Sequence, residues 1–471
     1  MSRTLEPSGD EFRALVHEAT DRIATYLDTL PEQPAHDSDG GAELARSLAE
    51  PMPESGGSFE EVLDLLFDRA VHKGFNTAGP GYLAYIPGGG LPHSALAGLI
   101  AETVNRYVGV WLATPALVQL EANVVRWFCD MVGFPVGSLG ILTTGGSLAN
   151  FSAIVTARRD RLPANFLNGT IYVSDQVHHS VDKAAMLAGF PHENVRVIES
   201  DELFRMRIDR LEHQISADRA DGLSPFLVVG SAGTVNTGAV DDLPSIASLA
   251  AEHGLWFHVD GAYGGFFVLT EQGKEALVGI DLADSVTLDP HKGLFLPYGV
   301  GSLLVRDGSA LARAHSSSGA YMPPMQDDPD FVDFCQLSPE LSRGNRGLRV
   351  WLPFKLAGVQ AFRDLLDEKL DLTRWATERL REIGDVEIVA EPELSVVAFR
   401  LKRPGLEREE LNELNRALLE GVNRRKRVFV TGTAVRGEFF LRLCVLSFRT
   451  HMDRMMMAIE DIEQAAADLP Q

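Results

Sequence analysis

The sequence predicts an α/β protein with a mostly parallel seven-stranded sheet and crossover helices, followed by a smaller C-terminal α+β domain. Short apolar runs alternate with helical stretches between residues 140 and 305, which is typical of parallel strands joined by crossover helices. The chain has 471 residues, too many for one hydrophobic core and enough for two or three domains. The seven runs lie at residues 140–143, 171–174, 195–198, 226–232, 256–260, 285–289 and 301–305.

Two amphipathic helices are expected before the sheet region. Residues 10–30 and 59–72 carry apolar side chains at helical spacing, and residues 31–56 between them are rich in Pro, Gly, Ser and acid, as in a linker. A further helix begins at Thr114-Pro115, where a capping hydroxyl precedes proline. Because the first two helices precede the main core, we expect a partner subunit to cover their apolar faces.

The chain after the sheet region divides into a loop, a helix and a smaller unit. Residues 305–345 are irregular and residues 346–384 are helical in pattern. Strands are expected near 386–389, 395–401, 428–431 and 438–444, and helices near 407–423 and 452–467. We therefore expect an N-terminal helical segment over 1–80, a large domain over 81–350 and a small domain over 351–471.

Composition narrows the class of partner. A net charge of −23 argues against nucleic acid and against an anionic membrane surface, since both need clustered Lys and Arg. The three cysteines have neither metal-site spacing nor a disulfide framework, which favours a reducing cytoplasm. No apolar run approaches 18 residues and the first residues lack a signal-peptide core, so we expect no membrane span.

A lysine follows one of the expected strands. Pro290 ends the run at 285–289 because it cannot donate to a sheet ladder, and Lys292 follows at the strand end, where α/β folds bind ligands. Between His291 and the apolar residues 294–296, the amine should be partly desolvated, which favours its neutral, nucleophilic form. Such an amine forms Schiff bases with carbonyl compounds. The alternative is an ordinary surface lysine in a loop.

A glycine-rich turn follows the first strand of the sheet region. Residues 143–150 read Thr-Thr-Gly-Gly-Ser-Leu-Ala-Asn and open a helix, so the N–H groups of Gly146 and Ser147 are suited to a phosphate. No Gly-Lys-Ser/Thr follows, which excludes a Walker loop. The alternative is a helix capped by Ser147 or Thr144 with no ligand.

Two more polar groups end strands of the same region. His178 can stack on an aromatic cofactor or transfer protons near neutral pH. The carboxylate of Asp260 needs a cation, and the small Ala262 leaves room for a flat ring. A metal site made by His258, Asp260, His178 and His291 is the alternative. It explains neither Lys292 nor the glycine turn, so we expect no metal.

Along the chain, the motifs follow the order glycine turn, histidine, aspartate and lysine. In this order they resemble the motifs of the group II decarboxylases that depend on pyridoxal 5′-phosphate (PLP), the aromatic-L-amino-acid decarboxylase family. The likeness extends over nearly the whole chain. The lysine motif of the family matches Asp289-Pro290-His291-Lys292, and its Ser-Asp-Gln-x-His segment matches residues 174–178. Its His-Val-Asp-x-Ala-Tyr segment matches residues 258–263.

The resemblance implies a fold-type I, PLP-dependent transferase-like fold and a role for each matching residue. Lys292 would hold PLP covalently, Asp260 would pair with the pyridine nitrogen, and His178 and Ala262 would contact the two ring faces. Gly146 and Ser147 would bind the phosphate, Thr234 would lie beside the cofactor, and His291 would lie near the phosphate or the lysine. The family also implies a homodimer with a shared active site and N-terminal helices wrapped on the partner.

The loop before the helix at 346–384 departs from the family pattern. Phe334 stands where the family has a catalytic tyrosine on a mobile loop, and phenylalanine has no proton to give after CO₂ leaves. Tyr321 is the other candidate donor. The sequence thus predicts PLP-dependent decarboxylation of an L-amino acid, aromatic by default, to the amine. Alternatives are oxidative decarboxylation to an aldehyde and a non-enzymatic interaction protein that keeps the fold.

Overall fold

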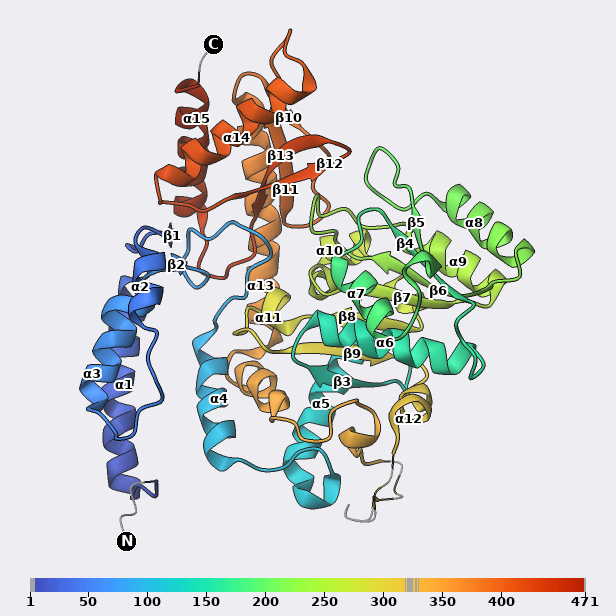
Figure 1. Cartoon of the computed structure of the whole chain (residues 1–471), viewed down its shortest axis with the longest axis horizontal. Helices are drawn as coiled ribbons and strands as arrows, with labels where there is room; N and C mark the ends of the chain where they lie inside the picture. The colour runs from blue at the N-terminus through green and yellow to red at the C-terminus, as the bar shows by residue number, and fades with distance from the viewer. Residues whose placement is uncertain (1–4, 318, 320–324, 327, 329, 470–471) are drawn as a thin grey trace.

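A seven-stranded sheet lies at the centre of the large domain of the computed structural model (Figure 1). The structure describes residues 5–317, 319, 325–326, 328 and 330–469. The sheet has the strand order β3-β9-β8-β7-β6-β4-β5. Its strands are β3 Leu139–Thr143, β4 Gly169–Ser174, β5 Val195–Ile198, β6 Ser224–Ser231, β7 Trp256–Gly261, β8 Ser285–Leu288 and β9 Gly301–Val305.

The strand directions confirm the predicted fold class. Strands β5, β4, β6, β7 and β8 run parallel, whereas β9 runs antiparallel to both β8 and β3. In the register of the sheet, Asp260 of β7 lies between Ser231 of β6 and Thr287 of β8. The carboxyl ends of the parallel strands therefore meet at one edge, as ligand-binding α/β sheets require.

Helices cover the sheet and connect its strands (Figure 1). The helices of this part are α4 Pro92–Val104, α5 Pro115–Met131, α6 Gly146–Arg161, α7 His179–Leu187, α8 Ile208–Ala220, α9 Leu243–His253, α10 Glu271–Ala276, α11 Pro290–Gly293 and α12 Ser309–His315. The sequence did not indicate α4. Its residues are apolar or small on most sides, so no polar face marks the helical period.

The C-terminal domain is a four-stranded antiparallel sheet in the order β10-β11-β13-β12, covered by helices. Its elements are β10 Val386–Ile388, β11 Val396–Leu401, α14 Arg408–Arg424, β12 Thr431–Val435, β13 Glu438–Cys444 and α15 Met452–Ala467. The predicted strand at 428–431 is wrong for most of its length. Phe429 bonds instead to the backbone of Gly81 and Leu83, in the segment before α4.

A long helix, α13 Arg346–Glu382, joins the two domains. Its first part contributes Val350 and Phe362 to the core of the large domain, and its last part contributes Ala376 and Leu380 to the core of the small one. The helix is kinked at Gly358, where φ is 73°. Because one helix belongs to both cores, the predicted boundary at 350/351 stays a prediction.

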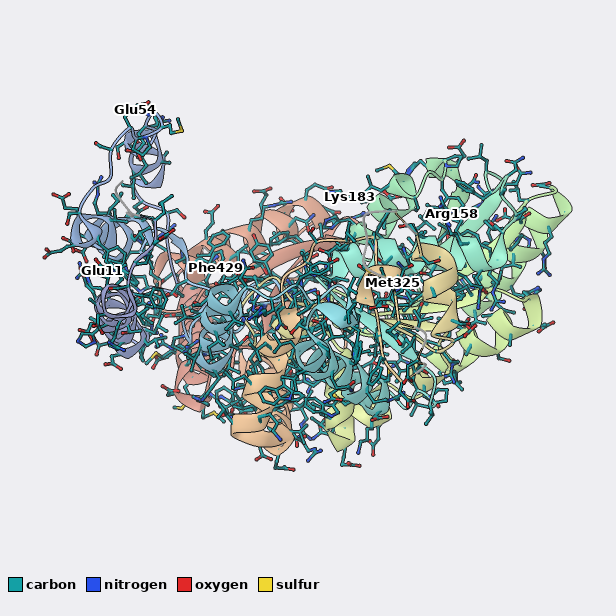
Figure 2. All side chains as sticks on the ribbon, turned by 90° about the horizontal axis from the view of Figure 1, so that it is seen from below. Glu11, Glu54, Arg158, Lys183, Met325 and Phe429 are labelled. Carbon is teal, nitrogen blue, oxygen red and sulfur yellow. The ribbon has the colours of Figure 1, made fainter. Side chains whose placement is uncertain are left out.

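The N-terminal segment lies to one side of the molecule. Its helices are α1 Gly9–Thr29, α2 Gly41–Ser47 and α3 Phe59–Asp64, the last continued by a π-helical turn over Leu65–Ala70. Figure 2 shows this segment, with Glu11 and Glu54, standing away from the body of the protein. No residue of α1 is buried. The predicted linker thus contains a helix, α2, and a short strand, β1 His36–Asp37, which pairs with β2 Gly74–Phe75.

Among the described residues, no helix combines the length and the apolar character that crossing a membrane requires. Cys129, Cys335 and Cys444 are all unpaired and buried.

Candidate active site

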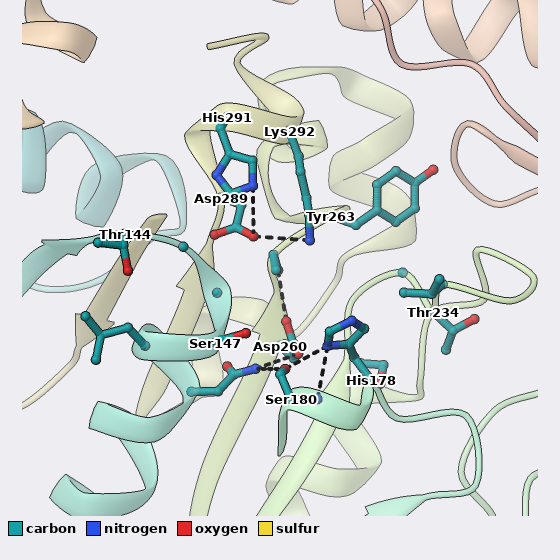
Figure 3. Close-up of a pocket in the computed structure, with 18 of the residues that line it drawn as sticks. Thr144, Ser147, His178, Ser180, Thr234, Asp260, Tyr263, Asp289, His291 and Lys292 are labelled. Carbon is teal, nitrogen blue, oxygen red and sulfur yellow. Dashed lines mark hydrogen bonds and ion pairs between the residues drawn. The ribbon is translucent and has the colours of Figure 1, made fainter. Parts of the chain in front are cut away.

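A cavity of about 310 Å³ opens at the carboxyl ends of the parallel strands (Figure 3). The structure brings most of the sequence-predicted site residues to its walls: Gly146, Ser147, His178, Thr234, Asp260, Ala262, His291 and Lys292. They come from five separate parts of the chain, so only the fold brings them together. A cavity with convergent polar groups at this edge of an α/β sheet is typical of a ligand site.

Lys292 reaches the cavity from α11, the single helical turn that follows β8. Its side chain is 18% exposed, and its Nζ atom lies 3.1 Å from Oδ2 of Asp289. We expected a mainly apolar surrounding for this amine. The structure corrects that expectation, because the amine lies in an ion pair with a buried carboxylate.

Asp289 is a site residue that the sequence reasoning missed. It is 2% exposed, and its Oδ1 atom has no hydrogen-bond donor among the described residues. The signal in the sequence was an acid directly before the Pro-His-Lys run. A buried acceptor without a donor costs about 1–3 kcal/mol, so this atom marks a place where a bound ligand can complete the site.

His291 lies on the other side of the same carboxylate, with its Nε2 atom 3.7 Å from Oδ2 of Asp289. Its Nδ1 atom donates to the carbonyl oxygen of Val300 at 2.6 Å. Burial lowers the pKa of His291, so the ring is neutral near pH 7. The carbonyl of Val300 fixes the orientation of the ring.

The glycine turn opens α6 directly into the cavity. Gly145 occupies the N-cap position, and no side chain caps the helix. The alternative interpretation, a helix capped by Ser147 or Thr144, is therefore wrong. Uncapped N–H groups and the positive end of a helix dipole together form an anion site. A Cβ atom on Gly146 would lie 3.0 Å from the Asp289 carboxylate, so the turn and that carboxylate are in close contact.

Asp260 ends β7 at the floor of the cavity and is 9% exposed. Its Oδ1 accepts from the backbone N–H of Ala262 at 3.1 Å, and its Oδ2 accepts from Nδ2 of Asn150 at 2.9 Å. Asn150 is the second residue that sequence reasoning missed as functional. It lies one turn after Gly146 on α6, and this spacing was the available signal.

His178 is the N-cap residue of α7, and its Nδ1 atom accepts from the backbone N–H of Ser180 at 3.2 Å. Burial lowers the pKa of His178, which keeps the imidazole neutral near pH 7. The side chain points into the cavity on the same side as Asp260, below Lys292 in the view of Figure 3. Thr234 stands at the far wall, where its hydroxyl lies 3.0 Å from that of Thr237.

The structure does not bring Phe334 to this cavity. Its side chain is 1% exposed in the core of the large domain, and the guanidinium of Arg343 lies 4.9 Å from the ring centre. Phe334 is not among the residues that line the cavity. Tyr321 lies outside the described residues.

The residues of the alternative metal site have other partners. Both ring nitrogens of His258 are in hydrogen bonds, Nδ1 with Ser285 at 2.8 Å and Nε2 with Asn150 at 3.1 Å. Over the part of the chain that the structure describes, no group of three His, Cys, Asp or Glu is placed to hold a metal ion.

Comparison with known proteins gives one consistent result. Residues 43–402 match the model of the pyridoxal-dependent decarboxylase conserved domain. The aromatic-L-amino-acid decarboxylase of Bacillus atrophaeus is 34% identical over 471 residues, which cover 100% of this chain and 98% of that protein.

Solved structures agree with this match over nearly the whole chain. A crystal structure of TDC from Oryza sativa with PLP and tryptamine superposes with a TM-score of 0.94 at 25% identity, covering 98% of this chain and 99% of that one. The 4-hydroxyphenylacetaldehyde synthase of Rhodiola rosea gives a TM-score of 0.92 at 25% identity, with the same coverage.

The chemical groups of the cavity fit PLP, the cofactor of this family, independently of the comparisons. It combines a lysine amine, an uncapped helix end for a phosphate and a buried carboxylate at the end of β7. With the match over residues 43–402 and 34% identity along the full chain, the protein belongs to the pyridoxal-dependent decarboxylase family and is a PLP-dependent amino-acid decarboxylase.

Proposed function

We propose that this enzyme decarboxylates an aromatic L-amino acid to the corresponding amine. The observation that carries the proposal is the convergence of Lys292, Asp260 and the open end of α6 on one cavity. The relative from Bacillus atrophaeus is named for aromatic amino acids, and the rice structure contains tryptamine. These names support an aromatic substrate for a chain that shares their fold over nearly its whole length.

We assign each of these cavity residues a separate role in binding PLP. Lys292 would attach the cofactor, Gly146 and Ser147 would bind its phosphate at the start of α6, and Asp260 would accept a hydrogen bond from the pyridine nitrogen. His178 and Ala262 would contact the ring, and Thr234 and His291 would complete the walls. When bound, PLP supplies an electron sink for the charge left on the substrate when CO₂ departs. The carboxylate of Asp260 would favour the protonated ring nitrogen, which strengthens that sink.

The proton that completes the reaction must come from a group near the substrate. His178 accepts hydrogen bonds at Nδ1, so its one proton is on Nε2, which faces the cavity in Figure 3. We assign His178 as the group that holds a proton on the substrate side. Tyr321 remains a second candidate from the sequence.

The aldehyde alternative rested on Phe334 in the place of the loop tyrosine. Phe334 is buried against Arg343 and does not line the cavity of its own chain. The likeness to the synthase of Rhodiola rosea keeps the alternative worth testing. We propose the amine as the product.

We further propose a homodimer with a shared active site. The N-terminal helices and α4 leave large apolar side chains exposed: Phe12, Leu15 and Ile23 on α1, and Leu96, Leu99 and Ile100 on α4. Exposed apolar side chains gathered on helix faces in this way are typical of a subunit interface. The three unpaired cysteines support a cytoplasmic location.

Product analysis tests the proposed function. The purified enzyme with PLP is incubated with single L-amino acids, with and without oxygen, and the products are identified by mass spectrometry. We expect an amine from at least one aromatic amino acid, with no oxygen consumed. An aldehyde with oxygen uptake would establish the alternative reaction, and turnover of only non-aromatic amino acids would refute the proposed substrate class.

A further inference from the structure

One amide lies at the centre of a buried network beneath the cavity. Asn150 is 1% exposed, and its Nδ2 atom donates to Oδ2 of Asp260 at 2.9 Å and to Oγ of Ser180 at 3.1 Å. Its Oδ1 atom accepts from Oγ1 of Thr287 at 2.8 Å and from Nε2 of His258 at 3.1 Å. These four bonds use both donors and both lone pairs of the amide.

The proton positions in this network follow from chemistry. An ionised carboxylate can only accept, so the Asn150 amide must turn its NH₂ group to Asp260 and its oxygen to His258. Nε2 of His258 is then a donor, and Nδ1 accepts from the hydroxyl of Ser285 at 2.8 Å. The oxygen of Ser285 accepts in turn from the indole N–H of Trp256 at 2.8 Å. Each donor on this branch has an acceptor, and Nε2 of His258 also lies 3.4 Å from Oγ1 of Thr287.

The second branch leads to His178. Oγ of Ser180 accepts from Nδ2 of Asn150 and lies 2.7 Å from Nδ1 of His178. The backbone N–H of Ser180 donates to the same nitrogen. The imidazole therefore has its proton on Nε2, the nitrogen that faces the cavity (Figure 3).

We propose that Asn150 is a positioning residue that orients the carboxylate of Asp260 directly and the imidazole of His178 through Ser180. Loss of the Asn150 amide would remove one donor from Asp260 and one from Ser180, the residue whose backbone N–H donates to Nδ1 of His178. Asp260 would thereby stay an oriented acceptor for the ring nitrogen of bound PLP, while His178 would present a donor to the substrate side. This inference rests on the proposed roles of Asp260 and His178 toward PLP.

Two substitutions test the amide. Asn150→Leu keeps a similar volume and removes all four bonds, whereas Asn150→Asp keeps the shape and replaces the donor with a second acid beside Asp260. Ser152→Ala is the matched control, because Ser152 is equally buried on α6 and donates only to the carbonyl oxygen of Leu148 in its own helix. All three variants and the native protein are prepared as holoenzymes.

The first readout is the protonation of the bound cofactor. The ¹⁵N NMR signal of the pyridine nitrogen and the visible absorption band are followed against pH. In Asn150→Leu we expect the ring nitrogen to lose its proton at a lower pH than in the native enzyme, and kcat to fall by about 10- to 100-fold, as for loss of a hydrogen bond to a charged group. Ser152→Ala should match the native enzyme in both.

Asn150→Asp gives a sharper pH signature. At low pH, one proton shared between the introduced carboxylate and that of Asp260 can replace the amide donor, so this variant should resemble the native enzyme. As pH rises, the second carboxylate ionises and the two like charges repel, so the variant should diverge from the native enzyme. A merely structural role for Asn150 would lower thermal stability without this pH dependence.

A second readout does not depend on cofactor loading. Ring ¹⁵N signals report the tautomers of His258 and His178 in protein with or without PLP, and Asn150→Leu should lose the single Nε2–H tautomer at His258. Native pyridine and histidine signals in both Asn150 variants would overturn the inference. Absence of PLP from native Lys292 would instead refute the proposed function, so the two failures are distinguishable.

Discussion

The amine of Lys292 and the carboxylate of Asp289 form an ion pair at 3.1 Å, directly beside the glycine turn that opens α6. The sequence indicated the lysine, the histidine and Asp260, because each follows a recognisable strand. It did not indicate that Asp289 turns back toward the lysine or that Asn150 bonds to Asp260. Those contacts depend on how α6, β7 and α11 are packed, and no local pattern encodes that packing.

Asp260→Asn tests the role of the acid at the end of β7. Asparagine presents an amide that cannot ionise, so the ring nitrogen loses the charge that keeps it protonated. We expect kcat to fall by about 100-fold or more while PLP stays bound, measured by steady-state kinetics and visible absorbance. Asp242→Asn is the control, because asparagine caps α9 as well as aspartate does. Native turnover by Asp260→Asn would contradict the assignment.

His315 offers a pH prediction away from the cavity. Its Nε2 atom lies 3.1 Å from Oγ1 of Thr156, and burial lowers its pKa to about 4. The unfolded chain takes up a proton at this site below about pH 6.5, whereas the folded chain resists protonation until about pH 4. This group therefore destabilises the fold as pH falls through that window, by about 2 kcal/mol at about pH 5.

His315→Gln should remove that dependence, because glutamine can donate to Thr156 without titrating. Urea unfolding midpoints are compared for the native protein and the variant at about pH 7.5 and about pH 5. The native protein should lose more stability than the variant on acidification. An equal loss in both proteins would show that His315 titrates normally in the fold.

At the scale of elements, the seven strands of the main sheet were all predictable, because each is a short apolar run between helical stretches. Errors occurred where tertiary contacts decide the structure. The segment at 428–430 has strand composition but bonds to residues 81–83 outside the sheet. Helix α4 lacks a polar face, so its period was hidden.

The close contact between β9 and the glycine turn leads to a prediction about Gly301, the first residue of β9. A Cβ atom on Gly301 would lie 2.6 Å from Cα of Gly145 and 2.7 Å from Oδ1 of Asp289. Because backbone atoms cannot yield cheaply, Gly301→Ala should displace the turn and weaken PLP binding by about 10-fold or more. Equilibrium titration of the apoenzyme with PLP measures this, and Gly384→Ala, with nothing within 4 Å, is the control. Unchanged affinity would mean that the turn does not hold the phosphate.

At the scale of the whole molecule, the exposed apolar faces of α1 and α4 predict self-association. Leu15→Asp together with Leu99→Asp places charges on both faces, at side chains that are 39% and 41% exposed. Sedimentation velocity should show a dimer for the native protein and a shift toward monomer for this variant, with loss of activity if the site is shared. Val136→Asp is the control, since Val136 is 99% exposed in a loop. A monomeric native enzyme with full activity would contradict the dimer.

The central claim is that Lys292 carries the cofactor in a cavity whose floor is Asp260. Borohydride reduction of the PLP-loaded enzyme, followed by proteolysis and peptide mass spectrometry, tests it most directly, because reduction fixes the cofactor on the amine that holds it. The account predicts a single modified peptide with the pyridoxyl group on Lys292 and none after Lys292→Ala. A label on another lysine, or no label in an enzyme that still decarboxylates, would contradict it.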